Sequence, residues 1–286
     1  MKILVTGATG FVGKHVINEL LKNDHQVIAA ARKNDLGNNA DRITYTFLDI
    51  DNLDKTQNYF SWFDNPDLLI HLAWQGLPNY TSLFHFENNL PVQYSFLKNM
   101  VVNGLKNMVV TGTCFEYGMK EGCLAEDMIA DPQNPYALAK DTLRKFLFEL
   151  QKKHAFDCKW IRLFYMYGEG QNANSILSQL QTALKNNDEV FNMSGGEQER
   201  DYLPVEKIAE YIVTIALQKK ISGIINCCSS KPIKVKRLVE NYLKDTKQEI
   251  KLNPGYYPYT DYEAMSFWGD DAKLKKIINE RSYTGI

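Results

Sequence analysis

Six short apolar runs alternate with longer amphipathic patterns over the first 165 residues of this 286-residue chain, and no other feature limits its fold as strongly. The runs are apolar throughout rather than at every second residue, which is typical of strands buried on both faces of a parallel sheet. The predicted strands are Lys2–Thr6, Gln26–Ala31, Ile43–Leu48, Asp67–Leu72, Lys106–Gly112 and Cys158–Phe164. Helical patterns lie between them, near residues 11–23, 52–62, 83–103 and 134–153. This alternation predicts an α/β fold with a Rossmann-type, doubly wound parallel sheet and right-handed crossovers.

The pattern changes after Gly168, and the elements that follow are shorter and more varied. We expect a first domain over residues 1–168, to which 204–228 returns, and a smaller C-terminal region over 169–286. The expected elements of this second half are a helix near 173–186, a strand around Val190–Met193, a helix over 204–217, a strand at Ile221–Cys228 and a long ordered loop over Asn253–Trp268.

The charge balance excludes several kinds of partner. The chain has 33 Lys and Arg residues against 34 Asp and Glu, whereas proteins that bind nucleic acids or anionic membranes usually carry a basic excess. No apolar run approaches the roughly 18 residues that a membrane span needs, and the N-terminus does not resemble a signal peptide. The five cysteines form no Cys-x-x-Cys pair, so we expect reduced thiols and no metal site. These features predict a cytoplasmic protein without nucleic-acid or membrane partners.

A glycine-rich loop follows the first predicted strand, with the spacing Gly-x-x-Gly-x-x-Gly over Gly7–Gly13. We expect Gly7 to permit a tight turn, Gly10 to let the backbone approach a pyrophosphate, and Gly13 to allow close packing of helix and strand. The N–H groups at the start of the helix are suited to an anion. The sequence therefore predicts a dinucleotide site rather than a purely structural turn, with further contacts from Thr9, Phe11 and Val12.

The end of the second predicted strand bears on the choice of dinucleotide. An NAD site usually has an Asp or Glu there for the ribose hydroxyls, whereas this strand ends in Ala31-Arg32-Lys33. The Arg32 guanidinium could bind a 2′-phosphate, which favours NADP(H) and leaves NAD(H) possible. The alternative is that Arg32 and Lys33 are solvated loop charges. Asp49, with Ile50 beside it, is either an adenine contact or a helix N-cap.

Tyr136 and Lys140 form a Tyr-x-x-x-Lys pair on a predicted helix, which places both side chains on one face. A neighbouring ammonium favours the phenolate form of a tyrosine, so Tyr136 could exchange a proton with a carbonyl or hydroxyl group. Thr113 ends the fifth predicted strand, where ligands of such sheets bind, and its hydroxyl could bind a substrate oxygen. Tyr-x-x-x-Lys alone is common on exposed helices, so the interpretation depends on all three residues.

With these pieces together, the chain resembles the extended short-chain dehydrogenase/reductases, the family of nucleotide-sugar epimerases, dehydratases and reductases. The matching segments are TGATGFVG at 6–13, HLAW at 71–74, TGTCFEYG at 111–118, YALAK at 136–140, RLFYMYGEGQ at 162–171 and RDYLPVEKIA at 200–209. The resemblance implies a dinucleotide-binding domain over 1–168 and a nucleotide-sugar-binding region over 169–286. It also implies a homodimer formed by the helices near 83–103 and 134–153.

The resemblance assigns roles residue by residue. It makes Thr113, Tyr136 and Lys140 catalytic, and the last two would also contact the cofactor. Leu72, Ala73 and Asn89 would line the cofactor cleft. The expected substrate contacts are Trp74, Cys114, Phe115, Tyr165 and Arg200, with Arg200 on the nucleotide diphosphate.

Departures from the family pattern reduce the number of reactions that this chain could catalyse. Dehydratases of this family carry an Asp-Glu pair directly after the catalytic Thr, where this chain has Cys114 and Phe115, so we exclude a dehydratase. Tyr165 replaces the Asn of the family motif, which alters the sugar pocket. Glu116 is unusual and either faces the substrate or is a satisfied polar residue at a strand end. The aromatic residues of 255–268 resemble those of small 4-keto-sugar reductases, or are simple packing of a terminal loop.

Three functional hypotheses follow. The first is NADP(H)-dependent reduction of a nucleotide-linked 4-keto-6-deoxy sugar, for example dTDP-4-dehydro-6-deoxyglucose to dTDP-fucose, in bacterial surface polysaccharide biosynthesis, with residues around 174–203 on the base. The second is a nucleotide-sugar 4-epimerase that retains NAD. The third is a dinucleotide-sensing protein without turnover, which would have no need of a proton donor at Tyr136.

Overall fold

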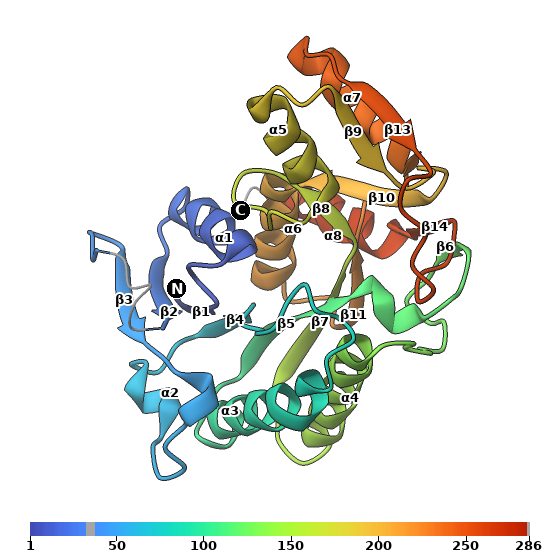
Figure 1. The fold of residues 1–286 in the computed structure, drawn as a ribbon. Helices are drawn as coiled ribbons and strands as arrows, with labels where there is room; N and C mark the ends of the chain where they lie inside the picture. Colours follow the sequence, from blue (N-terminus) through green and yellow to red (C-terminus); the bar gives the residue numbers. More distant parts are fainter. Residues whose placement is uncertain (33–37, 285–286) are drawn as a thin grey trace.

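A computed structural model describes residues 1–32 and 38–284 (Figure 1). Its centre is a sheet of seven parallel strands in the order β11-β7-β5-β4-β1-β2-β3. The strands are β1 (Lys2–Thr6), β2 (Gln26–Ala31), β3 (Ile43–Phe47), β4 (Leu68–His71), β5 (Asn107–Thr113), β7 (Asp157–Leu163) and β11 (Gly223–Cys227). The six strands predicted for the first 165 residues are all present, each boundary within one residue of its expected place. The predicted Rossmann-type fold is confirmed.

Helices cover both faces of this sheet, as Figure 1 shows. One face packs against α1 (Phe11–Leu21), α6 (Val205–Leu217) and α8 (Ala272–Thr284). The other packs against α2 (Tyr59–Trp62), α3 (Leu90–Val102) and α4 (Pro135–Gln151). Alternate residues of β1 enter the two cores, Ile3 and Val5 on the first face and Leu4 on the second. A strand with both faces buried has to be apolar throughout, which explains the continuous runs in the sequence.

Two predicted helices differ from expectation. The helix expected near 52–62 is reduced to a 3₁₀ turn, η2 (Ile50–Asn52), and the single turn α2. Asp54 explains the interruption, because its Oδ1 accepts hydrogen bonds from the backbone N and Oγ1 of Thr56 at 2.8 and 2.7 Å. Such local side-chain bonds compete with the helical backbone pattern. The helix expected over 83–103 begins as a π-helical turn, η3 (His85–Asn89), before α3.

A smaller region is built from segments that follow Gly168 together with two short strands that precede it (Figure 1, upper right). Leu177, Leu180, Phe191 and Val239 form part of its own apolar cluster. Strands β13 (Lys251–Pro254) and β14 (Phe267–Gly269) include the two ends of the loop predicted over Asn253–Trp268, so only its middle is irregular. The elements are β6 (Gly122–Leu124), β8 (Tyr165–Tyr167), β9 (Val190–Met193), β10 (Glu199–Pro204), β12 (Pro232–Lys234), β13 (Lys251–Pro254), β14 (Phe267–Gly269), α5 (Ile176–Asn186) and α7 (Val235–Thr246).

The order of the strands fixes where a ligand can bind. β1 and β4 are neighbours, but α1 after β1 and α3 after β4 cover opposite faces of the sheet. In open parallel sheets this divergence leaves a crevice at the carboxyl ends of the strands. Among the described residues, no helix has the length and apolarity to span a membrane. The same residues contain no cluster of three or more His, Cys, Asp or Glu side chains suited to a metal ion.

Candidate active site

The glycine-rich loop lies at this crevice and is closed to side chains at two positions. Gly7 has a φ of +69°, and a Cβ there would lie 2.8 Å from the backbone N of Ala73 at the end of β4. A Cβ on Gly13 would lie 2.1 Å from the carbonyl oxygen of Gly7. These contacts are far shorter than van der Waals distance. The loop, the first turn of α1 and the end of β4 can therefore approach one another only with glycine at both positions.

The N-terminus of α1 has the properties of an anion site. Gly10 is the N-cap of this 11-residue helix, and no side chain caps the first turn. The first N–H groups of a helix lack partners within the helix and carry the positive end of its dipole. Since Gly10, Phe11 and Val12 line a cleft, these groups are close to a space that a ligand can enter. The loop Gly7–Gly13 and the first turn of α1 together form a glycine cradle that fits the pyrophosphate of a dinucleotide.

A cleft of about 610 Å³ lies along this edge of the sheet. It brings together residues from the ends of β1, β4, β5 and β7 with the start of α4. Thirteen predicted site residues line it: Gly7, Gly10, Phe11, Val12, Gly13, Leu72, Trp74, Thr113, Cys114, Phe115, Tyr136, Lys140 and Tyr165.

The predicted contacts for the adenosine half lie outside this lining. Arg32 is exposed at the end of β2, and Lys33 lies outside the described residues. Asp49 caps η2, accepting from the backbone N of Asp51 at 3.2 Å and from Asn52 Nδ2 at 2.8 Å. The N-cap alternative for Asp49 is therefore observed, and an adenine contact stays a prediction. Ile50 is buried in the core between the sheet and α3.

Three further predicted contacts are also absent from the lining. Thr9 is part of the turn between β1 and α1, and Ala73 supplies the backbone that faces Gly7. Asn89 is fully buried, and its Nδ2 donates to the carbonyl oxygen of Gln75 at 2.9 Å. Their contacts with a dinucleotide stay predictions.

Arg200 is buried in a polar cluster rather than open to the cleft. Its Nε donates to the Tyr165 hydroxyl at 3.2 Å and its Nη2 to Glu263 Oε2 at 3.0 Å. Its Nη1 donates to the backbone carbonyl oxygens of Glu199 and Met265 at 2.8 and 3.0 Å. Arg200 is 1% exposed, so a diphosphate could reach its guanidinium only after these contacts rearrange. Glu263, which sequence reasoning did not single out, also accepts a hydrogen bond from Tyr165 at 2.5 Å.

Tyr136, Lys140 and Thr113 meet at the floor of the cleft. Burial raises the pKa of Tyr136, and a hydrogen bond with the Thr113 side chain partly opposes the rise. Tyr136 is therefore protonated at neutral pH, which is the state of a proton donor, and not the phenolate that a neighbouring ammonium would favour. Burial lowers the pKa of Lys140 to about 7. Lys140 Nζ donates to the carbonyl oxygen of Thr111 at 2.8 Å and lies 4.0 Å from the centroid of the Trp74 ring.

An aromatic wall surrounds the Tyr136 ring, and only part of it was predicted. The ring centroids of His85 and Tyr80 lie 5.3 and 5.5 Å from that of Tyr136, and Trp74 lies 6.0 Å away. The backbone N of Tyr136 donates to the carbonyl oxygen of Tyr80 at 3.1 Å. Tyr80 belongs to an irregular segment without a motif, so local sequence gave no signal for it. Residues Gly170–Asn172, Asn174 and Ser175 line the cleft as well. Gly170 and Gln171 fell in a recognised segment, and Asn174 and Ser175 fell in the region expected to contact the base, so only Asn172 was missed.

Glu116 does not face the substrate. Its side chain is fully buried, and Oε1 accepts hydrogen bonds from the backbone N of Thr113 at 3.0 Å and from Trp160 Nε1 at 2.9 Å. Its Oε2 accepts from Arg162 Nε at 2.8 Å. A Cβ on Gly112 would lie 2.1 Å from Trp160 Nε1 and 2.3 Å from Glu116 Oε1. Of the two alternatives, the satisfied polar residue is correct.

A family model described as "NAD dependent epimerase/dehydratase family" matches residues 3–228, most of the chain and all of the central sheet. The chain belongs to the NAD-dependent epimerase/dehydratase family. The resemblance drawn from the six sequence segments is thereby confirmed. The family implies a nicotinamide dinucleotide, and the glycine cradle and the uncapped start of α1 fit that group.

The chain is similar to proteins whose names describe reactions on nucleotide sugars. The chain is 31% identical over 271 residues to dTDP-6-deoxy-L-talose 4-dehydrogenase (NAD(+)) of Aggregatibacter actinomycetemcomitans, covering 94% of this chain and 99% of the relative. It is 23% identical to CDP-abequose synthase of Salmonella muenchen, covering 96% and 91%. A solved structure of the UDP-glucuronic acid 4-epimerase from Bacillus cereus, with UDP-glucuronic acid and NAD, has the same fold with a TM-score of 0.84. That structure is 23% identical and covers 98% of this chain and 93% of the epimerase.

Proposed function

We propose that this protein is a nucleotide-sugar 4-ketoreductase that reduces the C4 carbonyl of a nucleotide-linked 6-deoxy sugar, as in bacterial surface polysaccharide biosynthesis. The family match and the relatives named for reactions on nucleotide sugars support an enzyme of this family that modifies nucleotide sugars. The observation that carries the proposal of a 4-ketoreductase is that Thr113, Tyr136 and Lys140 line one cleft with the glycine-rich loop.

The first residues after Thr113 support reduction over dehydration. Cys114 and Phe115 occupy the positions where a dehydratase needs an acid and a base. Burial raises the pKa of the Cys114 thiol, so it stays neutral and cannot remove a proton from carbon. Phe115 has no ionisable group, and its ring packs 5.2 Å from that of Tyr80. The cleft therefore offers Tyr136 as its proton donor beside a hydroxyl from Thr113.

Each of the three residues has a distinct task. When bound, a reduced nicotinamide dinucleotide supplies the hydride that goes to C4 and is itself oxidised. Tyr136 donates the proton from its hydroxyl to the C4 oxygen, which completes the reduction of the ketone to a secondary alcohol. Thr113 orients that oxygen through its hydroxyl. The Lys140 ammonium stabilises the Tyr136 phenolate that the proton transfer leaves.

A substrate panel tests the proposal. With nucleotide-linked 4-keto-6-deoxy sugars, we expect one substrate to oxidise NADPH or NADH in a 1:1 ratio, followed at 340 nm and by chromatography of the sugar product. The reverse reaction, with the 6-deoxy sugar and the oxidised dinucleotide, should reduce the dinucleotide. Interconversion of two nucleotide hexoses without net oxidation, with dinucleotide bound to the purified protein, would instead establish the 4-epimerase.

Cofactor choice is a separate part of the proposal. We propose that NADP(H) is preferred, because Arg32 is exposed at the end of β2 and the strand ends without an acid. The relative named as NAD(+)-dependent supports the opposite choice. Replacing Arg32 with Ala is expected to raise the KM for NADPH by about 10-fold, the loss of one charge-assisted contact, and to leave the KM for NADH within about 2-fold. Equal effects on the two dinucleotides would contradict a role in binding the 2′-phosphate.

We also propose a homodimer formed through α3 and α4. Val102 on α3 and Leu138 and Phe146 on α4 are apolar side chains that are 43–48% exposed. The Phe146 ring contacts Tyr94 of α3, with centroids 5.2 Å apart, so apolar side chains of the two helices adjoin at this point. Apolar side chains gathered on neighbouring helices are typical of an interface.

A further inference from the structure

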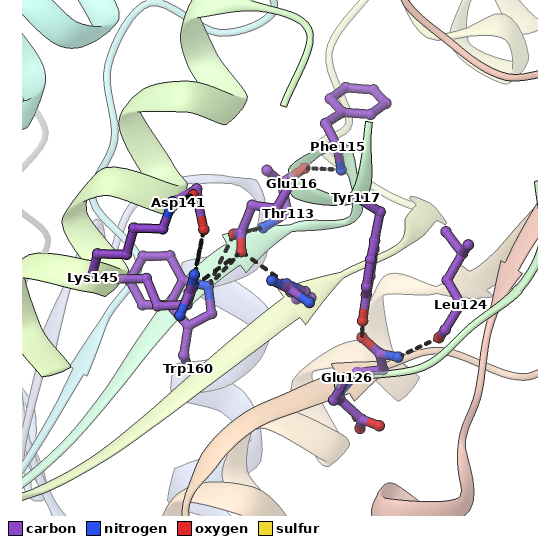
Figure 2. Close-up of polar contacts among 12 residues, drawn as sticks. Thr113, Phe115, Glu116, Tyr117, Leu124, Glu126, Asp141, Lys145 and Trp160 are labelled. Atoms are coloured by element: carbon purple, nitrogen blue, oxygen red, sulfur yellow. Dashed lines mark hydrogen bonds and ion pairs between the residues drawn. The ribbon is translucent and has the colours of Figure 1, made fainter. Parts of the chain in front are cut away.

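Glu116 is an acidic residue in an environment that is costly for an acid. Its carboxylate has no solvent contact and receives hydrogen bonds from the backbone N of Thr113 and from Trp160 and Arg162 (Figure 2). Burial of an unpaired carboxylate would cost several kcal/mol, so this set of donors is what allows it to be there. The carboxylate thereby joins the end of β5, where Thr113 lies, to two side chains of the neighbouring strand β7.

The same carboxylate is linked to α4. Arg144 Nε lies 3.9 Å from Glu116 Oε2, and Arg144 Nη2 lies 2.5 Å from Asp141 Oδ1. Asp141 follows Lys140 directly in the sequence, and Figure 2 shows it on α4, facing this network. Glu116 therefore lies between the strand end that carries Thr113 and the helix that carries Tyr136 and Lys140.

Glu116 also acts on Lys140 through its charge. Burial lowers the pKa of Lys140, and the negative charge of Glu116 opposes that effect. The other titratable groups around Lys140 do not assist: burial lowers the pKa values of His71 on β4 and His85 on η3, which leaves both neutral. Tyr136, on the same helix, is protonated because burial raises its pKa.

We propose that Glu116 is a positioning residue for the reaction: it holds the backbone of Thr113 in register with α4 and places a negative charge behind Lys140. The inference rests on the proposed function for its catalytic consequence. Glu116 is not among the residues that line the cleft, so it acts through Thr113 and Lys140 rather than on the substrate. If Glu116 served only the stability of the fold, a folded variant without its charge would keep the kcat and the pH profile of the unaltered protein.

The substitution Glu116→Gln separates geometry from charge, because the amide keeps an acceptor for Thr113 and Trp160 but is neutral. We expect kcat at pH 7.5 to fall about 10-fold, with the KM for the nucleotide sugar within about 2-fold, because a smaller fraction of Lys140 remains as the ammonium. Activity that needs the Lys140 ammonium is lost as the pH rises through the pKa of Lys140. Without Glu116 that pKa is lower, so the alkaline limb of the kcat profile should move to lower pH.

Glu126→Gln is the matched control. The Glu126 carboxylate also accepts a hydrogen bond from a backbone N, that of Asn226 at 2.9 Å, but it lies near Tyr117 and away from Thr113 and α4 (Figure 2). We expect this variant to retain the kcat and the alkaline limb of the unaltered protein. If Glu116→Gln shows the same kcat and the same limb as Glu126→Gln in an active enzyme, the proposal is overturned.

A titration of Lys140 tests the charge effect without turnover. In the full chain labelled with ¹³C-lysine, the Lys140 resonance is identified by its loss in Lys140→Arg and followed against pH. We expect a lower pKa in Glu116→Gln than in Glu126→Gln, and equal values would overturn the proposal. If no nucleotide sugar is turned over, the proposed function fails, whereas this titration still decides the effect of Glu116.

If Glu116→Gln does not fold, a double variant can still test the effect of the Glu116 charge. Removal of one partner leaves the Arg162 guanidinium buried without its acceptor, which is destabilising. Glu116→Gln with Arg162→Gln replaces the ion pair by two amides that can bond each other. We expect this variant to fold and to have a lower Lys140 pKa than a variant that keeps the Glu116 charge. Because Arg162→Gln also removes a positive charge, the double variant is compared with Arg162→Gln alone. Equal Lys140 pKa values in these two folded variants would exclude the effect of the Glu116 charge.

Discussion

Replacement of Tyr136 by phenylalanine is expected to lower kcat by about 10²-fold to 10⁴-fold, the usual contribution of a positioned proton donor. The ring remains and should keep its packing against Tyr80, His85 and Trp74, so the fold and the cleft should be retained. Only the hydroxyl that bonds the Thr113 side chain is lost. Dinucleotide binding, measured by calorimetry, should stay within about 2-fold, because the phenol supplies few of the dinucleotide's contacts.

Tyr80→Phe is the matched control for this substitution. It removes a hydroxyl from the neighbouring ring, whose centroid lies 5.5 Å away, and burial raises the pKa of Tyr80 to about 12, so it too is protonated at neutral pH. We expect Tyr80→Phe to retain kcat within about 3-fold. Turnover that survives in Tyr136→Phe would exclude Tyr136 as the proton donor, and a large loss in Tyr80→Phe alone would transfer that role to Tyr80.

The second large effect is expected at Gly13. An alanine there would place its Cβ 2.1 Å from the carbonyl oxygen of Gly7, so α1 and the loop after β1 would have to separate. Overpacking of this kind destabilises a fold by about 1–3 kcal/mol. It would also displace the helix N-terminus proposed to hold the pyrophosphate, so we expect kcat/KM for the dinucleotide to fall about 100-fold.

Chemical denaturation and initial rates measure the two parts of this prediction. Lys14→Ala is the control, because Lys14 is the next residue of α1 and its side chain is exposed. Lys14→Ala should leave the free energy of unfolding and the kcat/KM for the dinucleotide nearly unchanged. If Gly13→Ala binds the dinucleotide as tightly as Lys14→Ala does, the cradle is not the pyrophosphate site.

The sequence could predict those parts of the fold that depend on local pattern. Strands such as β1 and β5 are buried on both faces and therefore apolar throughout, so their limits are visible in the sequence. The roles of Gly7 and Gly13 could also be predicted. A Cβ on Gly13 would clash with the backbone of Gly7 in the same loop, and a Cβ on Gly7 would clash with the backbone of Ala73, which follows the adjacent strand β4. The helix predicted near 52–62 was wrong because Asp54 bonds locally to Thr56, which a helical pattern of apolar residues does not reveal.

What the sequence could not decide depends on partners distant in the chain. Glu116 was left with two interpretations because Trp160 and Arg162, 44 and 46 residues away, determine that it is buried and paired. The diphosphate role of Arg200 stays a prediction, since Glu263, 63 residues later, occupies its Nη2. Tyr80 lies against Tyr136 only because an irregular segment folds back over the start of α4, and its backbone bond to Tyr136 spans 56 residues.

Gly112 constrains how this site can have arisen. Because a Cβ at position 112 would overlap both Trp160 Nε1 and Glu116 Oε1, any side chain at 112 is incompatible with the pairing of those two residues. Substitutions at the three positions are therefore not independent, and their effects on stability should not add. An ancestral chain with a larger residue at 112 could acquire the Glu116–Trp160 pair only after, or together with, a change to glycine. Once the pair is formed, a larger residue cannot replace Gly112 unless the Glu116–Trp160 pair is lost first.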